Sequence, residues 1–241
     1  MGYKIFIGTS GWSYKHWRGI FYPKDLPADR WFEYYCRYFQ TVEINNSFYH
    51  LPKIKTFKTW YAKAPKDFIF SVKGSRFITH MKKLKEPRKS VKKFLTHASY
   101  LKEKLGPVLF QLPPRWKVNI ERLSTFIKSL PGNLKFVFEF RGNSWFNKRI
   151  FELLNKEEQA FCAHDMRGID CPRLMTDKLA YIRFHGTTRI YGGKYSRKQL
   201  EDWASFIRRC AKKGEVYVYF NNDAQGYAIE NALMLKKILK Q

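Results

Sequence analysis

Eight short apolar runs alternate with longer helix-like segments along the whole chain. The runs are rich in aromatic and β-branched residues, are bounded by turn residues, and occupy residues 4–9, 41–45, 68–73, 108–112, 136–141, 160–165, 179–185 and 216–222. Helices are expected at residues 30–39, 55–64, 90–105, 120–130, 147–155, 197–213 and 228–239, whereas residues 171–178 follow no regular pattern. Alternating strands and helices favour parallel βαβ units, and eight strands in 241 residues predict a (β/α)8 TIM barrel. A doubly wound open sheet is the alternative.

Nothing in the sequence divides the chain into separate parts. No linker rich in Pro, Gly or Ser interrupts it, and no fixed-period repeat is visible. Hydrophobic residues make up 44% of the chain and charged residues 27%, which is enough apolar material for a sizeable core. We therefore expect residues 1–241 to form one α/β domain.

Polar and apolar residues alternate along the expected strands, so that the polar residues share one face (one parity) and the apolar residues the other. The polar parity holds Glu43, Asn45, Ser71, Lys73, Glu139, Arg141, Arg183 and His185. Further polar groups stand at the ends of runs four, six and eight: Gln111, Asp165, Asn221 and Asp223. Alternate residues of a barrel strand point inward, and active sites form at the C-terminal ends of the strands. Burying ions is costly unless they are paired, so this pattern predicts a functional mouth. The alternative is a self-satisfied ion-pair network, for example Glu139 with Arg183.

The chain is strongly basic. Its 46 Lys and Arg residues minus 20 Asp and Glu residues give a formal charge of +26. Such an excess attracts polyanions, and the 18% of aromatic residues could add base stacking. The densest basic run covers residues 82–93 and follows the third strand, where it could hold a polyanion across the mouth. The alternative is a solvated surface over a core filled by the rings.

The cysteines and the N-terminal segment bear on the cellular compartment. The four cysteines are far apart and include no C-x-x-C pair, so neither a zinc knuckle nor a disulfide framework is indicated. The first residues lead into a strand without the apolar stretch of a signal peptide, and no later run is long enough to span a bilayer. These features predict a cytoplasmic protein with reduced thiols and no membrane partner.

Two kinds of chemistry fit the predicted mouth. A divalent metal could be bound by residues of the set Glu43, Glu139, Asp165, Asp223, His80 and His185. No local ligand spacing supports this, and the cations Lys73, Arg141 and Arg183 compete for the carboxylates, so a metal is left open without being favoured. Without a metal, Glu139 or Asp165 would be the general base and His185 the acid/base. Lys73, Arg141 and Arg183 would then hold an anion.

Two glycine-containing loops extend this anion hypothesis. Residues 185–195 follow the seventh strand, where many barrels bind phosphate through backbone N–H groups. Residues 8–11, with Trp12, Tyr14 and Trp17 nearby, form a second wall lined by rings. Neither loop has the spacing of a Walker or dinucleotide-binding motif, and each could be an ordinary tight turn.

Several long motifs resemble the family called domain of unknown function 72, or YecE-like. They are GTSGWSY at 8–14, TVEINNSFY at 41–49, FSVK at 70–73 with ITH at 78–80, LGPVLFQLPP at 105–114, EFR at 139–141 with SW at 144–145, YIRFHG at 181–186 and VYFNND at 218–223. The motifs span nearly the whole chain. One small departure is Asn46-Ser47, where a Ser-Thr type pair is expected. The resemblance implies a TIM barrel, without an established activity, and it adds His80 to the candidate site.

The sequence thus predicts a set of site residues and three functions. The candidate catalytic residues are Glu43, Lys73, Glu139, Asp165 and His185. The candidate substrate-binding residues are Trp12, Asn45, Tyr49, His80, Gln111, Arg141, Arg183, Tyr191, Tyr195, Asn221 and Asp223. The leading hypothesis is an enzyme acting on a phosphate-bearing substrate, with hydrolysis of a DNA or RNA phosphodiester as its most specific form. The alternatives are a non-catalytic nucleic-acid-binding protein and a barrel enzyme acting on a small sugar or sugar phosphate. Substrate, cofactor and oligomeric state are left open.

Overall fold

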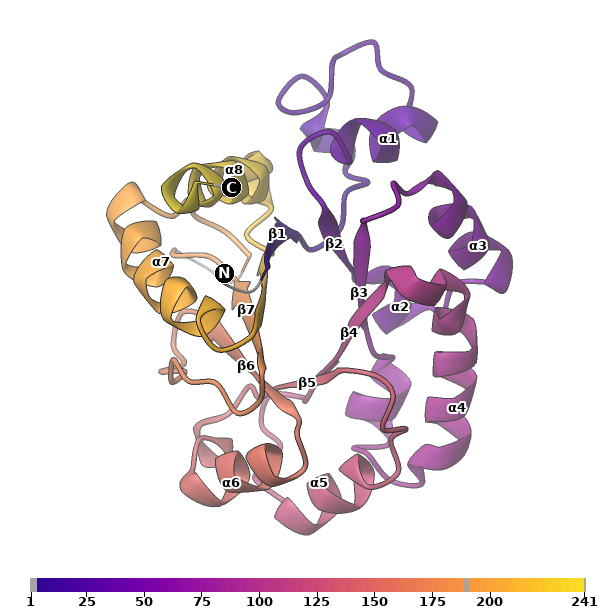
Figure 1. Ribbon diagram of the computed structural model, residues 1–241, viewed down its shortest axis with the longest axis vertical. Coiled ribbons are helices and arrows are strands. Elements are labelled where there is room, and N and C mark those ends of the chain that lie inside the picture. The colour runs from indigo at the N-terminus through magenta and orange to yellow at the C-terminus, as the bar shows by residue number, and fades with distance from the viewer. Residues whose placement is uncertain (1–3, 189–190, 241) are drawn as a thin grey trace.

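Eight parallel strands form one sheet that curves into a barrel, with the helices around its outside (Figure 1). The computed structural model describes residues 4–188 and 191–240. The strand order is β1-β8-β7-β6-β5-β4-β3-β2. The strands are β1 (Ile5–Thr9), β2 (Thr41–Ile44), β3 (Ile69–Lys73), β4 (Leu105–Gln111), β5 (Phe136–Glu139), β6 (Ala160–Asp165), β7 (Leu179–Phe184) and β8 (Glu215–Phe220). The predicted TIM barrel is therefore confirmed, and the open-sheet alternative is not.

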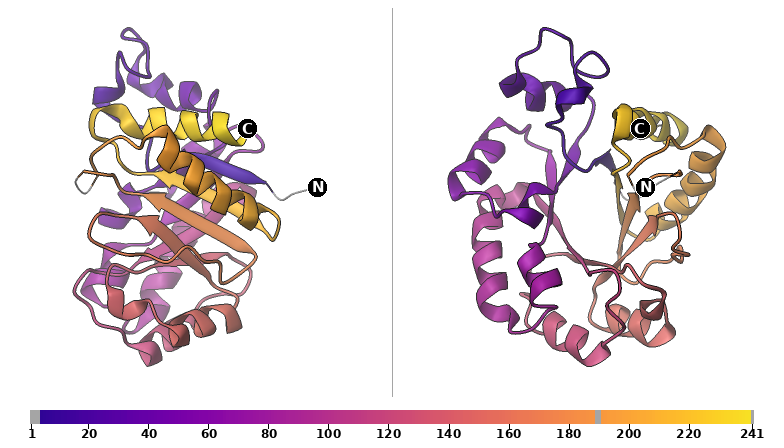
Figure 2. Two further views of the ribbon diagram at one scale, coloured as in Figure 1. Left: turned by 90° about the vertical axis from the view of Figure 1, so that its left-hand side faces the viewer. Right: turned by 180° about the vertical axis from the view of Figure 1, so that it is seen from behind.

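The helices follow the strands with one extra helix and one omission. They are α1 (Trp31–Tyr35), α2 (Asn46–Tyr49), α3 (Ile54–Lys63), α4 (Pro87–Ala98), α5 (Ile120–Ile127), α6 (Lys148–Lys156), α7 (Arg197–Ala211) and α8 (Tyr227–Leu239). Both α2 and α3 lie between β2 and β3, whereas no helix is assigned between β6 and β7. Figure 2 shows α7 and α8 side by side on the outside of the barrel.

A tyrosine hydroxyl joins the two strands at the seam of the barrel. The backbone N–H of Thr9 on β1 donates to the Tyr35 hydroxyl at 3.0 Å, and that hydroxyl donates to the carbonyl of Thr41 on β2 at 3.1 Å. A Cβ at Gly8 would lie 2.3 Å from the same carbonyl oxygen, so this close approach requires glycine. The seam satisfies edge groups that would otherwise be left unpaired.

The core has an outer and an inner part. The larger part packs between the sheet and the helices and contains most of the buried aromatic rings. The smaller part fills the barrel near the N-terminal ends of the strands, where Phe6 and Tyr217 stack at 4.8 Å. The buried charged residues of the strands, Glu43, Lys73, Glu139 and Arg183, lie toward the other end. The aromatic rings lie mainly in the core, as expected in the alternative interpretation, in which they fill the core beneath a solvated basic surface.

Most predicted boundaries differ from the structure by a few residues, and two of them show why. The helix expected at 90–105 ends at Ala98, because a short turn follows in which Lys102 takes a left-handed φ of 49°. Strand β4 then begins at Leu105 rather than at residue 108. The irregular segment 171–178 is confirmed, and the Thr176 hydroxyl holds it against β6 by accepting from the N–H of Phe161 at 2.9 Å.

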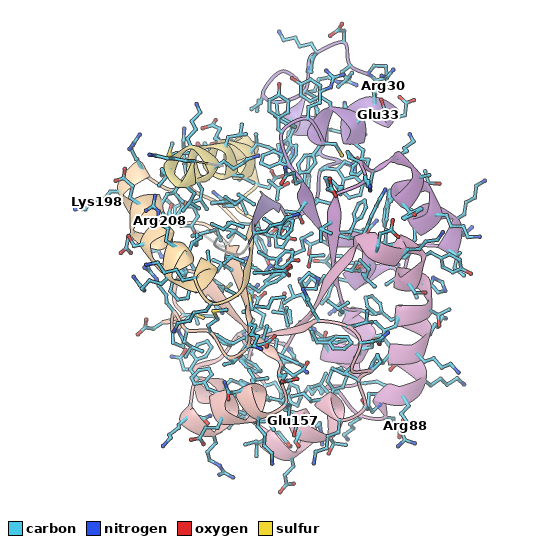
Figure 3. The ribbon with its side chains drawn as sticks, viewed as in Figure 1. Arg30, Glu33, Arg88, Glu157, Lys198 and Arg208 are labelled. Atoms are coloured by element: carbon cyan, nitrogen blue, oxygen red, sulfur yellow. The ribbon has the colours of Figure 1, made fainter. Side chains whose placement is uncertain are left out.

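The outer surface carries most of the charges, for example those of Arg30, Arg88, Lys198 and Arg208, which are labelled in Figure 3. In the described ranges, every helix is too short or too polar to cross a membrane.

Candidate active site

Two glutamates and one arginine form a buried, salt-bridged layer across the barrel. Glu43 on β2, Glu139 on β5 and Arg183 on β7 are all 0% exposed. Arg183 donates through Nη2 to Glu43 Oε1 at 2.7 Å and through Nη1 to Glu139 Oε2 at 2.6 Å. Hydroxyls of Ser10 and Tyr181 also donate to Glu43, at 2.6 and 2.7 Å. Both carboxylates are thus paired and hydrogen-bonded, which buried charges require.

Arg141 and His185 follow Glu139 and Arg183 by two residues, just beyond the C-terminal ends of β5 and β7. Arg141 donates through Nε to Glu139, and its Nη2 lies 3.1 Å from Nε2 of His185. A guanidinium can only donate, so Nε2 of His185 accepts from Arg141 and its ring is neutral. Nδ1 lies 3.3 Å from the side-chain amide of Asn221, which can accept the Nδ1 proton only through its oxygen. The 3.2 Å contact between Nε2 and Glu139 is therefore not an ion pair.

The pKa shifts agree with these assignments. Burial opposes ionisation of Glu139, but the guanidinium groups of Arg141 and Arg183 outweigh it and hold the pKa of that carboxyl well below its usual range. Burial, together with the same two guanidinium groups, lowers the pKa of His185 well below its usual range. The site therefore contains an ionised Glu139 beside a neutral imidazole.

Lys73 differs from the other buried ions of this site because it has no counter-ion contact among the described residues. It ends β3, is 7% exposed, and its Nζ lies 4.1 Å from the centre of the Phe48 ring. Among residues 4–188 and 191–240, no acceptor lies within hydrogen-bonding distance of Nζ and no carboxylate lies within 4.0 Å. Burial and the Arg183 charge lower the pKa of Lys73 to about 7.

Further polar atoms at the mouth have weak partners or none. Nη1 of Arg141 points to the sulfur of Met166, which is a weak acceptor. The side-chain carbonyl oxygens of Gln111 and Asn45 are buried and receive no hydrogen bond from the described residues. The register pairs Gln111 with Glu139 on β5, and Asn45 directly follows Ile44, which pairs with Val72 on β3. These atoms therefore belong to the same end of the barrel as Lys73 and Arg141.

The charges of the site balance except at one position. Glu43 and Glu139 carry two negative charges, and Arg141 and Arg183 carry two positive charges. His185 is neutral, so the charge left without compensation is that of protonated Lys73. A small anion placed beside Lys73 and Arg141 would remove this imbalance and receive their N–H donors.

The structure brings most of the predicted residues together. The hydrogen-bonded chain joins Glu43, Arg183, Glu139, Arg141, His185 and Asn221, with Lys73, Gln111 and Asn45 at the same end. The pair proposed in the ion-network alternative, Glu139 with Arg183, is present.

Asp165 and Tyr195 lie on the other side of the barrel wall. The Asp165 carboxylate accepts from the indole of Trp203 on α7 at 3.3 Å, and burial raises its pKa. The inward positions of β6 are those of Cys162 and His164, which leaves Asp165 facing the helices. Tyr195 is buried against Phe184. Asp165 is therefore not placed to be a base in this site.

Other predicted residues stand at the rim. Asp223 accepts from the indole of Trp17 at 2.6 Å and pairs with His16 at 2.9 Å, while burial raises its pKa to about 6. Tyr49 is 69% exposed, and the exposed Tyr191 ring lies edge-on to His185 at 5.8 Å.

His80 is half-buried and shares the Phe48 ring with Lys73, at 5.0 Å between ring centres. Burial lowers the pKa of His80 to about 4, so this imidazole is neutral at pH 7.

A cavity of about 430 Å³ lies beside the mouth, between the segments that follow β1 and β2. Trp12 and Trp60 contribute its aromatic walls and Asn45 part of its polar lining. The ring of Trp12 packs edge-on to Trp60 at 5.4 Å. This cavity could receive the part of a substrate that carries no charge.

The loop after β7 offers fewer free amides than its glycines suggested. The N–H of Gly186 donates to the Tyr195 hydroxyl at 3.0 Å, and the N–H of Tyr191 donates to the carbonyl of His185. Arg189 and Ile190, which belong to the predicted anion-binding loop, lie outside the described residues. The N–H groups in the described part of the loop therefore mainly form hydrogen bonds within the loop itself.

Sequence reasoning missed several interior residues. His164 points inward, with Nε2 at 2.9 Å from the carbonyl of Phe140 and its ring 5.8 Å from His185. Burial lowers the pKa of His164 to about 4. Ser10 and Tyr181, which bind Glu43, were also not among the candidates. Inward parity identifies Tyr181, because it precedes Arg183 by two positions.

The carboxylates considered as metal ligands are bound by other side chains. Arginines hold Glu43 and Glu139, Trp203 holds Asp165, and Trp17 and His16 hold Asp223. In the part of the chain that the structure describes, no group of three or more His, Cys, Asp or Glu residues is arranged to bind a metal.

Comparison with known proteins identifies the family. The model of the family described as "Protein of unknown function DUF72" matches residues 6–241. The chain belongs to the DUF72 family. This match confirms the DUF72 resemblance of the sequence motifs. The matched range includes every strand of the barrel except the first residue of β1.

Individual DUF72 relatives agree in sequence and in fold. UPF0759 protein YunF of Bacillus subtilis is 26% identical over 98% of this chain and 94% of its own length. UPF0759 protein YecE of Escherichia coli K12 is 31% identical over 60% of this chain and 51% of its own length. The crystal structure of a DUF72 protein from Thermotoga maritima superposes with a TM-score of 0.91 and 29% identity, covering 99% of this chain and 100% of that one. One from Enterococcus faecalis, at 20% identity, has a TM-score of 0.87 over 99% and 96% of the two chains.

Proposed function

We propose that this protein is an enzyme that acts on a small phosphate-bearing substrate at the C-terminal mouth of its barrel. The observation that carries the proposal is the pair of cations, Lys73 and Arg141. Both are nearly buried, yet Lys73 has no acceptor among the residues that the structure describes, and Arg141 directs one N–H group at a thioether. Charged donors in a desolvated site bind anions more strongly than the same donors in water.

The unpaired acceptors narrow the substrate further. Gln111 and Asn45 each present a buried carbonyl oxygen that receives no hydrogen bond from residues 4–188 or 191–240. A substrate hydroxyl group would satisfy such an oxygen, and an unpaired buried acceptor costs about 1–3 kcal/mol. Lys73, Gln111 and Arg141 retain only slight exposure, which suits a small terminal phosphate better than a duplex. These features support the sugar-phosphate form of the hypothesis over the phosphodiester form.

The buried residues beneath the mouth act through Arg141. Glu139 accepts from its Nε and His185 accepts from its Nη2, so together they fix the plane of the guanidinium. We assign Lys73 and Arg141 to direct contact with the substrate, and Glu43, Glu139, Arg183 and His185 to positioning.

Phosphate should stabilise the native protein through this site. We expect the melting temperature to rise as phosphate is titrated at constant ionic strength, because a ligand bound only by the native state adds about 2.7 kcal/mol at 100 times its Kd. Arg141→Lys keeps the charge and loses the planar donor fork, so the apparent Kd should weaken about tenfold or more.

The matched control for this titration is Arg149→Lys, at an exposed position on α6. It should leave the phosphate effect unchanged. Equal weakening in both variants, or no phosphate effect in the parent protein, would contradict the proposal. Acetate and sulfate, titrated in parallel, distinguish a general anion site from one that prefers phosphate.

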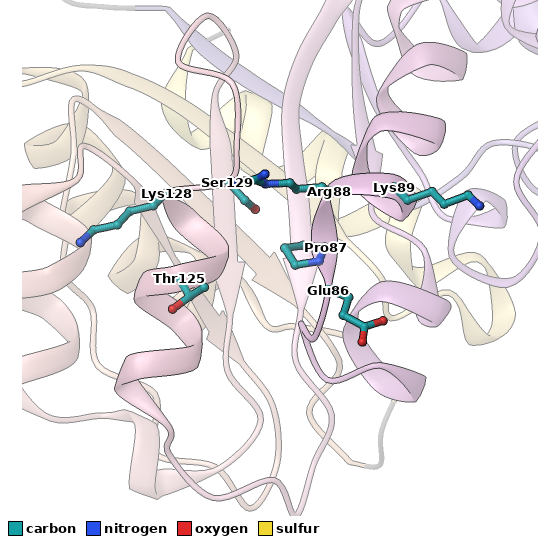
Figure 4. Close-up of a pocket in the computed structure, with 7 residues that line it drawn as sticks. All are labelled: Glu86, Pro87, Arg88, Lys89, Thr125, Lys128 and Ser129. Carbon is teal, nitrogen blue, oxygen red and sulfur yellow. The ribbon is translucent and has the colours of Figure 1, made fainter.

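We propose nucleic-acid binding as a second candidate function, carried by a basic groove between α4 and α5. Three adjoining hollows of about 440, 540 and 630 Å³ make up the groove. Its basic residues are Lys82, Lys83, Lys85, Arg88, Lys89, Lys92, Arg122 and Lys128, and its one acidic residue is Glu86. Figure 4 shows the middle hollow, with the first residues of α4 on one side and Thr125, Lys128 and Ser129 on the other. A line of cations in a groove fits a phosphate backbone.

Salt dependence tests this second function. If four to six phosphates of duplex DNA are neutralised, log K should fall with log salt at a slope of about −4 to −5. Replacing Arg88, Lys89, Lys92 and Lys128 by Gln should flatten the slope by about 2 or more. Replacing four exposed lysines outside the groove, Lys55, Lys156, Lys198 and Lys212, removes the same charge and should change the slope less. Identical slopes for the two quadruple variants would show that the groove has no special role.

A further inference from the structure

Two lysines of this chain are equally buried but differ in their surroundings. Lys73 and Lys104 are each 7% exposed. Nζ of Lys104 donates to the carbonyls of Tyr61 at 2.8 Å and Ala64 at 2.7 Å. Lys104 therefore serves the structure by satisfying two carbonyl groups. Within the described ranges, Nζ of Lys73 has no such acceptor, so its burial is not explained by any structural bond.

The surroundings of Lys73 keep its amine available at neutral pH. Burial removes water from the ammonium form, and the positive charges of Arg183 and Arg141 disfavour it further, so the pKa is about 7. The nearby carboxylates of Glu43 and Glu139 are bound by arginines and do not pair with Lys73. An unprotonated amine that faces a mouth with anion-binding donors is a nucleophile.

We propose that Lys73 forms an imine with a substrate that carries a carbonyl group, a hydroxyl group and a phosphate. This inference rests on the proposed function, because Arg141 must hold the phosphate and Gln111 or Asn45 must accept from the hydroxyl. The substrate class is a small phosphorylated hydroxy-aldehyde or hydroxy-ketone.

The covalent step balances without an oxidant or a reductant. The lone pair of Nζ attacks the carbonyl carbon, forming a C–N bond as the C=O π bond breaks, and one proton moves from the nitrogen to the oxygen. The resulting neutral carbinolamine loses that hydroxyl as water when one further proton arrives from solvent, leaving a protonated imine. Hydrolysis reverses these steps and restores the Lys73 amine. The positive imine lies beside the negative phosphate, which stabilises it.

Reductive trapping with pyridoxal 5′-phosphate tests the inference, because this probe carries an aldehyde, a hydroxyl and a phosphate. Borohydride converts the imine to a stable secondary amine, which mass spectrometry assigns to a lysine. At low probe concentration and pH 7, we expect Lys73 to be labelled at least tenfold faster than any other lysine. The labelling rate should rise with an apparent pKa of about 7. Pyridoxal, which lacks the phosphate, should label Lys73 at least tenfold more slowly, and inorganic phosphate should compete with the phosphorylated probe.

Two variants complete the experiment. Lys73→Arg should lose the fast labelling, whereas Lys104→Arg should keep it. Peptide mapping of the parent protein is decisive even if a variant fails to fold. Labelling spread over surface lysines, with Lys73 unmodified, would contradict imine formation at Lys73. If phosphate still stabilises the protein through Arg141 in that case, the proposed function stands without the imine; if it does not, both fail.

Discussion

Arg183→Met is expected to destabilise the protein by about 5 kcal/mol, enough to unfold a large fraction of it at 25 °C. Removing one partner of a buried ion pair costs about 3–5 kcal/mol, and Arg183 serves two carboxylates. Native proteins have only about 5–15 kcal/mol of stability in total. Urea unfolding followed by circular dichroism measures the loss. A loss below about 1 kcal/mol would show that the buried layer is not held by this arginine.

A second substitution should rescue part of that loss. Glu139 keeps Arg141 as a partner after Arg183 is removed, whereas Glu43 keeps only the hydroxyls of Ser10 and Tyr181. Combining Arg183→Met with Glu43→Gln removes the unpaired charge of Glu43. The double variant should recover about 2 kcal/mol or more of the lost free energy of unfolding.

Lys73→Met and Lys104→Met are expected to change stability in opposite directions. Lys73→Met removes a buried ammonium without a counter-ion and should stabilise the protein by several kcal/mol, about 2–5, at pH 7. Lys104→Met leaves the carbonyls of Tyr61 and Ala64 without donors, at a cost of about 1–3 kcal/mol each. Thermal and urea unfolding at pH 7 measure both effects. Destabilisation by Lys73→Met of the size seen for Lys104→Met would mean that Lys73 has a structural role.

The pH dependence of the Lys73→Met effect has a defined sign. The pKa of Lys73 falls from 10.5 to about 7 on folding. Above pH 10.5 the amine is neutral in both states and the parent protein is not penalised. As the pH falls from 10.5 to 7, the unfolded state binds the proton first, so the parent protein loses stability relative to Lys73→Met. The advantage of the variant should therefore grow over this range and stay constant below pH 7.

The barrel and most of its polar interior could be predicted from the sequence because the evidence for them is local. In β7, Arg183 and His185 alternate with Ile182 and Phe184, so the two-residue period of a strand settles which residues point inward. In β6 the residues before the last two are Ala160, Phe161, Cys162 and Ala163, which do not distinguish the faces. His164 and Asp165 are consecutive, and the pattern could not show that the first points inward and the second outward.

Partners that depend on the three-dimensional arrangement were not predictable. The alternation of polar and apolar residues placed Arg141 and Arg183 on the same face as the glutamates. It could not show that the arginines would neutralise both carboxylates and leave Lys73 without a counter-ion. Nor could it show that the backbone N–H of Gly186, which was expected to bind an anion, would instead donate to the Tyr195 hydroxyl. Both outcomes depend on contacts between residues of different strands and loops.

The position of a bound phosphate tests the central claim most directly. A crystal structure determined at a phosphate concentration above the Kd from the thermal titration would locate the ion. The account predicts an ion within hydrogen-bonding distance of Nζ of Lys73 and of Arg141, with the Arg141 donor turned away from the Met166 sulfur. Phosphate bound only elsewhere, for example along the groove between α4 and α5, with the mouth unchanged, would contradict it.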